Sequence, residues 1–118
     1  MKFPIARVVP VVAYGWSDDA SMAANNSHAF NLRLITGTIR FSQHSYGWAL
    51  DLNPMLNPCI TGDGRSCPPG AFHDHHVPGT LYRGSDVVNL FLSYGWTWGG
   101  NWSTLRDYQH FEKPLKII

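Results

Sequence analysis

The stretch that decides the fold reads Gly47-Trp48-Ala49-Leu50-Asp51-Leu52-Asn53-Pro54. From position 48 onward, large apolar residues alternate with small or polar ones, which is the period of two expected of a strand with two different faces. Pro54 has no backbone N–H for a sheet ladder, so the strand is expected to end before it. The sequence therefore predicts a β-strand over residues 47–53.

Two helices are predicted on either side of this strand. Residues 17–19 place an N-cap hydroxyl and two carboxylates at the positive end of a short helix that runs from Ala20 to about Asn25. A second helix is expected to begin at Ser85 and run through Tyr94, with Gly95 just after its C-cap. Because this helix is broadly apolar, we expect burial on more than one side for Val87, Val88, Leu90, Phe91 and Leu92.

The remaining segments show no repeat and no regular alternation of strands with helices. Residues 1–16 are mostly apolar and are expected to form an edge strand or a packing arm. Residues 54–84 are rich in proline and glycine, and a loop of ~30 residues in a small domain is often functional. Residues 107–112 are expected to form a turn that enters a final strand. We therefore predict one domain of class α+β over residues 1–118.

Composition excludes several classes of protein. The 118 residues are 44% hydrophobic and 14% charged, which argues against disorder. The net charge is +1 with no block of like charge, so nucleic acid is not an expected partner. No apolar run approaches membrane-spanning length, and Pro4, Arg7 and Pro10 interrupt any secretory signal at the start. We expect a monomer.

Two short segments carry the residue types of a zinc site. Residues 42–51 contain His44 and Asp51, and residues 107–112 contain Asp107 and His110. Catalytic zinc typically takes three nitrogen or oxygen ligands, and two imidazoles with one carboxylate leave it a strong Lewis acid. On one strand His44 and Asp51 would face opposite ways, so His44 is expected in a loop or turn before the strand. For the same reason Asp107 is expected in the turn before His110. Residue types alone, however, favour ordinary histidines.

The order and spacing of these residues resemble those of a known family. Its first zinc motif is similar to Ser42-x-His44-x-x-Gly47-x-Ala49-x-Asp51 followed by Asn53-Pro54, and its second to Asp107-x-x-His110. The family comprises bacterial cell-wall peptidases: D-alanyl-D-alanine carboxypeptidases, dipeptidases and L-alanyl-D-glutamate endopeptidases. Two further segments resemble the endopeptidase-like branch of the family. They are Asn31-x-Arg33-x-Ile35-x-Gly37 and Gly95-Trp96-x-Trp98-Gly99-Gly100-x-Trp102. The resemblance covers residues 17–112, and the segment before the first motif is short for the family.

This resemblance implies a fold and a set of roles. The fold is a small antiparallel sheet with flanking short helices, as in D,D-peptidases and Hedgehog proteins. One Zn²⁺ per chain would be bound by His44, Asp51 and His110, with Asp107 as the general base. Arg33 is the best match for the arginine that binds the scissile carbonyl or a neighbouring carboxylate. Arg40 is the alternative candidate for that role. The residues expected to bind substrate are Arg40, Ser42 and Trp98.

The implied substrate is the peptide stem of peptidoglycan, and endopeptidase and carboxypeptidase activities both remain open. Two other functions compete: a non-catalytic zinc-binding module on the same scaffold, and a wall-binding module built on the tryptophans without a metal. Action is expected at the cell wall or periplasm, in phage lysis, wall recycling or secreted remodelling. The lack of a signal peptide favours the first, an endolysin-like role.

Several weaker features carry two interpretations each. Residues 72–76 read Phe-His-Asp-His-His, and we favour a solvated loop over a second metal site at His73, His75 and His76. Core packing is favoured over ring stacking on substrate for Trp96, Trp98 and Trp102. Glu112 is expected either to support His110 or to form a surface salt bridge, and His28 is expected to be structural. Cys59 and Cys67 are expected to be either a local disulfide or two separate thiols.

Overall fold

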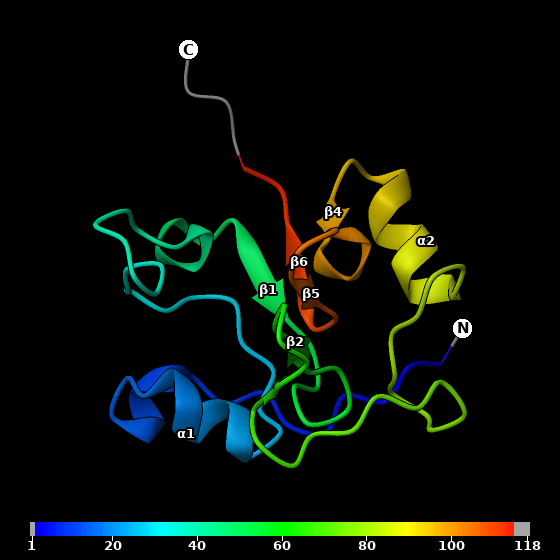
Figure 1. Ribbon diagram of the computed structural model, residues 1–118, viewed down its shortest axis with the longest axis horizontal. Coiled ribbons are helices and arrows are strands. Elements are labelled where there is room, and N and C mark those ends of the chain that lie inside the picture. Colours follow the sequence, from blue (N-terminus) through cyan, green and yellow to red (C-terminus); the bar gives the residue numbers. More distant parts are fainter. Residues whose placement is uncertain (1, 115–118) are drawn as a thin grey trace.

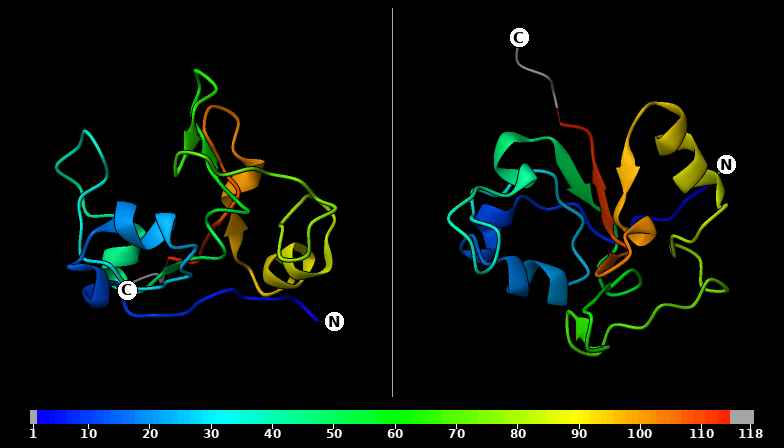
Figure 2. Two further views of the ribbon diagram at one scale, coloured as in Figure 1. Left: turned by 90° about the horizontal axis from the view of Figure 1, so that it is seen from below. Right: turned by 45° about the horizontal axis from the view of Figure 1, so that its top comes forward.

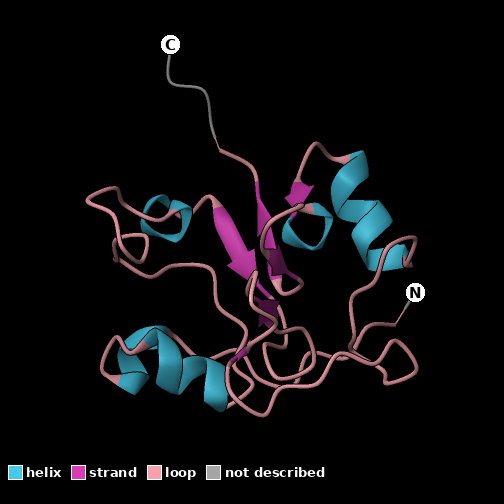
Figure 3. Ribbon diagram, viewed as in Figure 1, coloured by secondary structure: helices cyan, strands magenta, loops and turns pink. Residues whose placement is uncertain are grey.

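Two small antiparallel sheets form the centre of the molecule. The computed structural model describes residues 2–114. One sheet has the order β1 (Ala49–Asp51), β6 (His110–Glu112), β4 (Thr97–Trp98), and the other has the order β3 (Ser66–Cys67), β2 (Cys59–Ile60), β5 (Arg106–Asp107). Figure 3 shows these short strands among long connecting loops. The α+β prediction is confirmed.

Two helices lie on opposite sides of the strands, as Figure 1 shows. They are α1 (Asp18–Ala23) and α2 (Asp86–Ser93). The side chain of Ser17 accepts from the backbone N–H of Ala20, so the predicted cap of the first helix is formed. Ser85 is the N-cap of the second, and Gly95 follows it with φ +86°, a left-handed conformation that favours glycine. Both predicted helices are therefore present, with ends shifted by one or two residues.

The core lies between α2 and the β1–β6–β4 sheet. Its buried residues are Leu52, Leu81, Val87, Val88, Trp98 and Phe111. From α2 only Val87 and Val88 are buried, whereas Leu90 and Leu92 are 45% and 40% exposed. The prediction that this helix is buried on more than one side is therefore wrong. The helix contributes a single apolar stripe to the core because, in the part of the chain that the structure describes, the opposite side of α2 has no covering element.

The strand β1, at one edge of its sheet, is shorter than its sequence period suggests. β1 begins after Gly47, which has φ +71° and ends the 3₁₀ helix η2 (Gln43–Tyr46), and it stops before Asn53, which has φ +45°. The Asn53 side chain accepts from the N–H of Ala6 and donates to the carbonyl of Pro4. These bonds hold the N-terminal segment against the domain. As far as it is described, from residue 2 onward, that segment is a packing arm with one 3₁₀ turn, η1 (Val11–Tyr14).

The long 54–84 segment is mostly irregular but contains the β2–β3 hairpin. Buried asparagine side chains replace regular secondary structure as its anchors. The Asn57 amide donates to the carbonyls of Leu52 and Gly79 at 3.2 and 3.0 Å. Buried backbone carbonyls need such partners, so one side chain ties the two ends of the loop to the sheet. Figure 2 shows this segment running beside the strands from two further directions.

Candidate metal and catalytic site

His44 reaches the site from η2, immediately before the strand, as its spacing from Asp51 predicts. The hydroxyl of Ser42 accepts from the backbone N–H of His44, and Gly47 ends the turn in the left-handed conformation. The imidazole is completely buried, and its Nδ1 lies 3.0 Å from the carbonyl of Ala29. A carbonyl only accepts, so the proton is assigned to Nδ1. The lone pair of Nε2 therefore faces the interior of the site.

Asp51 and His110 lie directly opposite each other in the β1–β6 ladder. His110 Nδ1 is 3.1 Å from Asp51 Oδ1, and His44 Nε2 is 3.2 Å from Asp51 Oδ2. The two imidazoles approach each other as well, with 3.2 Å between His44 Nε2 and His110 Nδ1. Ligands at zinc bond lengths of 2.0–2.1 Å in a tetrahedron are ~3.3 Å apart. The donor atoms are therefore spaced as this ion requires.

Glu112 fixes the orientation of the His110 ring. Its Oε1 lies 2.9 Å from His110 Nε2, so this nitrogen carries a proton and donates it to the carboxylate. The lone pair of Nδ1 is then directed at the same point as that of His44. Of the two interpretations of Glu112, support of His110 is the one that the structure bears out. The lone pairs of these two ring nitrogens and the carboxylate of Asp51 would repel one another unless a cation lay between them. This set of donor atoms therefore fits a metal ion.

The electrostatics of these groups point the same way. Burial alone would lower the pKa of His110, but hydrogen bonds to Asp51 and Glu112 raise it to about 10. In His44 burial is likewise outweighed by the charge of Asp51, and the pKa is raised. The pKa of Asp51 lies well below its usual range, because the two imidazoles overcome the opposing effect of burial. In the metal-free protein these carboxylates therefore favour protons on the imidazoles, and a cation bound at the same place would take over that positive charge.

Asp107 lies beside these three residues. It ends the short strand β5, opposite Cys59, rather than lying in the turn that the sequence predicts. The residue is partly exposed, but its Oδ1 is buried and has no hydrogen-bond partner among the described residues. Burial, followed by the charge of Asp51, raises the pKa of this carboxyl to about 7. Gly99 makes this position possible, since a Cβ there would lie 2.9 Å from that of Asp107.

An open cleft of about 380 Å³ joins these groups. Its lining includes Asp51, His110 and Asp107, together with Arg33 and Trp102. Arg33 is therefore placed to meet a ligand, whereas Arg40 is exposed and does not line the cleft. The Nε atom of Arg33 is 3.7 Å from Asp18 Oδ2. Of the two arginines, only Arg33 faces the candidate metal ligands.

The comparison with protein families agrees with this geometry. Residues 36–113 match the model of a family described as D-alanyl-D-alanine carboxypeptidase. The chain belongs to this family. The matched range contains His44, Asp51, Asp107 and His110, so the membership that the motifs predict is confirmed. No solved structure matches the chain. In the described part of the chain, no helix has the length and apolar character needed to cross a membrane.

One expected substrate contact needs correction. Trp98 is 2% exposed and belongs to the core, where its indole N–H donates to the carbonyl of Tyr108 at 2.8 Å. Ser42 does line the cleft, and its hydroxyl also caps the turn that carries His44. The tryptophan that does line the cleft is Trp102, whose ring lies 5.3 Å from that of His110. Of these two tryptophans, Trp102 is therefore the one that lines the cleft.

Sequence reasoning missed one histidine at the site. The buried ring of His28 stacks on that of His44, with 4.8 Å between centroids. The potential ligand atoms of His28, His44 and Asp51 all lie within 4.8 Å of one another. His28 belongs to no motif, and it is brought to the site by a single antiparallel bridge to Asp51. No local signal in the sequence announces such a long-range pairing.

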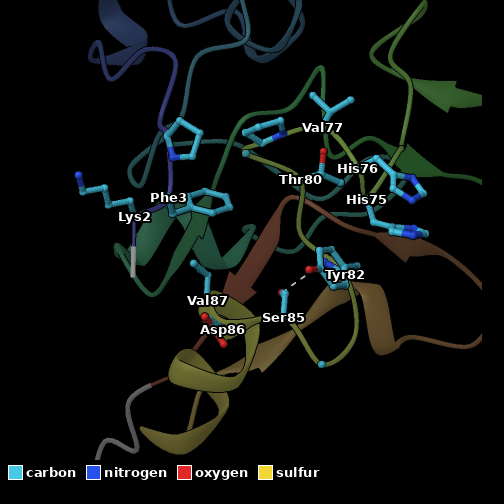
Figure 4. Close-up of a pocket in the computed structure, with 14 residues that line it drawn as sticks. Lys2, Phe3, His75, His76, Val77, Thr80, Tyr82, Ser85, Asp86 and Val87 are labelled. Atoms are coloured by element: carbon cyan, nitrogen blue, oxygen red, sulfur yellow. Dashed lines mark hydrogen bonds between the residues drawn. The ribbon is translucent and has the colours of Figure 1, made fainter.

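The histidines of residues 73–76 lie elsewhere. His73 stacks on Tyr108 at 3.9 Å, and its Nε2 lies 2.7 Å from the carbonyl of Leu81. His75 and His76 line a different pocket, next to Tyr82, as Figure 4 shows. Among the residues that the structure describes, these side chains are not part of the group that could hold a metal. His75 and His76 are exposed, as expected of a solvated loop, whereas His73 is packed against the domain.

The two cysteines are free thiols in this structure. Cys59 and Cys67 are partners in the β2–β3 register, and both line the cleft. Burial, followed by the charge of Asp107, raises the pKa of Cys59 to about 12. A thiol with such a pKa is protonated at neutral pH and is a poor metal ligand or nucleophile. Cys59 is therefore part of the cleft wall, and of the two interpretations the structure bears out separate thiols.

Proposed function

We propose that this protein is a zinc peptidase that hydrolyses peptide bonds in the stem peptides of peptidoglycan. The observation that carries the proposal is the convergence of His44, Asp51 and His110 at 3.1–3.2 Å, beside the unpartnered carboxylate of Asp107 in an open cleft. These three residues would hold the ion. Membership in the carboxypeptidase family supports the cell-wall substrate.

Zinc bound to these residues would supply Lewis acidity to the reaction. Asp107 acts as the general base, taking a proton from the attacking water and passing it to the leaving amine. In the metal-free protein burial raises the pKa of this carboxyl to about 7, and a bound cation would lower it toward its ordinary value. At neutral pH the carboxylate beside the ion would then be ionised and able to accept the proton of the water.

Arg33 positions the substrate. Its guanidinium lines the cleft, and arginine binds carboxylates and carbonyl oxygens through several N–H donors. In a carboxypeptidase it would hold the terminal carboxylate of the stem, and in an endopeptidase the carbonyl next to the cut. The position of Arg33 in the lining of the cleft that also contains Asp51 and His110 supports either role. We propose that the enzyme acts at the cell wall as a monomer.

The test combines metal analysis with product analysis. We expect the purified protein to contain one zinc per chain and to release fragments from purified peptidoglycan. Release of D-alanine identifies a carboxypeptidase, and a new amino terminus at D-glutamate identifies an endopeptidase. Bound zinc without any product would favour the non-catalytic module. A protein that contains no zinc and releases no product would overturn the proposal and favour a metal-free wall-binding module.

A further inference from the structure

His28 is fixed to the strand that carries Asp51 by a pair of backbone hydrogen bonds. The N–H of His28 donates to the carbonyl of Asp51 at 3.0 Å, and the N–H of Asp51 donates to the carbonyl of His28 at 2.8 Å. The residue is 5% exposed. Its side chain therefore lies at a defined place beside a candidate metal ligand, outside the range matched by the family model.

One ring nitrogen of His28 lies near two carboxylates. Its Nε2 is 3.6 Å from Asp18 Oδ1 and 3.7 Å from Asp51 Oδ2. Neither ring nitrogen forms a hydrogen bond in the described structure, and Asp18 Oδ1 and Arg33 Nε are also buried without a partner. Buried polar atoms are seldom left unpaired. Several such atoms lie only a few tenths of an ångström beyond hydrogen-bonding distance. We read them as a network of hydrogen bonds that forms when the metal binds.

The orientation of the ring distinguishes a metal ligand from a residue that supports one. The rings of His28 and His44 are stacked, with 26° between their planes. An ion bound to both would have to lie in both planes, and planes this nearly parallel meet far beyond a bond of ~2 Å. The rings of His44 and His110 are inclined by 66°, so their lone pairs can converge. The geometry therefore directs His28 at the carboxylate of Asp51 rather than at the ion.

We propose that His28 is a positioning residue whose Nε2–H holds the carboxylate of Asp51 in place for the metal, with the carboxylate of Asp18 beside the same N–H. This inference rests on the metal site of the proposed function. Groups that orient metal ligands in this way typically change metal affinity 10–100-fold when they are removed. Asp18 also lies 3.7 Å from Arg33, so the same network connects the metal ligands to the cation of the cleft.

The test measures zinc affinity of the full chain by competition with a chromophoric chelator. His28→Leu removes the donor, and we expect ~10–100-fold weaker binding with the stoichiometry unchanged at one zinc. In His28→Gln the amide nitrogen replaces Nε2, and affinity should return to within a few-fold of wild type. In His28→Asn the amide nitrogen sits where Nδ1 was, so it should behave like the leucine variant. His73→Leu is the matched control, because His73 packs on Tyr108 away from this cluster.

The alternatives give different results. A purely structural His28 would lower the melting temperature of the leucine variant and leave zinc affinity unchanged, which would overturn the inference. A ligand role would make His28→Gln as weak as His28→Leu and alter the visible spectrum of the cobalt-substituted protein, and this too would overturn it. If His28→Leu does not fold, the comparison of Gln with Asn decides. Wild-type protein that binds no zinc would refute the proposed function itself, which none of the variants can do.

Discussion

Replacing Asp107 by asparagine should make the metal-free protein more stable while it removes most of the activity. The folded protein raises the pKa of this carboxyl from 3.8 to about 7. Folding favours the protonated form of this carboxyl. Its contribution to the free energy of unfolding is therefore fully present below pH 3.8 and is lost as the pH rises to about 7. At about 1.4 kcal/mol for each pKa unit, the loss is at most ~4 kcal/mol above pH 7. An asparagine at position 107 carries no charge at any pH and therefore avoids this loss of stability.

Urea unfolding of the metal-free proteins at pH 5 and pH 8 measures this effect. The free energy of unfolding of Asp107→Asn should exceed that of wild type at pH 8 by ~2–4 kcal/mol, and the difference should shrink at pH 5. In the zinc-loaded proteins the same substitution should lower turnover of a stem peptide ~10²–10⁴-fold and keep one zinc per chain. Equal stabilities at both pH values would refute the argument that burial strains this carboxylate. Near wild-type turnover would refute its role as the base.

Four further predictions follow from the same site and core. His110→Ala should lose zinc as well as activity, because a ligand is removed, and metal analysis beside Asp107→Asn separates the two roles. Gly99→Ala should keep its zinc but lose ~10²-fold or more in turnover, since the added Cβ would overlap the backbone carbonyl of Asp107 and lie 2.9 Å from its Cβ, and steady-state kinetics on the loaded protein checks this. Turnover of wild type should fall as the pH drops, with a midpoint between 3.8 and about 7, because a bound cation lowers the pKa of Asp107 toward its ordinary value, and a pH–rate profile measures it. Phe111→Ala should lower the free energy of unfolding by ~3–5 kcal/mol, since this ring is 0% exposed, and urea unfolding tests it.

The parts of the fold that sequence predicts well are those with local chemical signals. The hydroxyl at Ser17 and the glycine at position 95 mark the ends of the two helices, and both ends are found within two residues. The spacing of His44 from Asp51 forces a turn between them, and a 3₁₀ helix supplies it. Motif order then brings His110 into the candidate site, where the β1–β6 register places it opposite Asp51.

The parts that sequence misses depend on pairings between distant segments. The strands β2, β3 and β5 have two residues each, too few to show any period. Trp98 ends β4 and is buried in the core, whereas Trp102 follows η3 and lines the cleft, a difference that the sequence around them does not reveal. His28 joins the site through one bridge to Asp51, which nothing in residues 25–31 announces. In each case tertiary packing, not local preference, decides the outcome.

The pairing of β1 with β6 also separates what must stay constant in this molecule from what is free to change. Asp51 and His110 are 59 positions apart in the chain but adjacent in the β1–β6 pair of strands, and both line the cleft. Its walls come from other segments: Ile35 from the loop before η2, Cys67 from the β2–β3 hairpin and Trp102 from the turn after η3 (Gly99–Asn101). None of these wall residues is a candidate ligand. Loops grafted from relatives would therefore change these walls and leave the β1–β6 pair unaltered, which gives the proposed peptidase a route to other stem peptides.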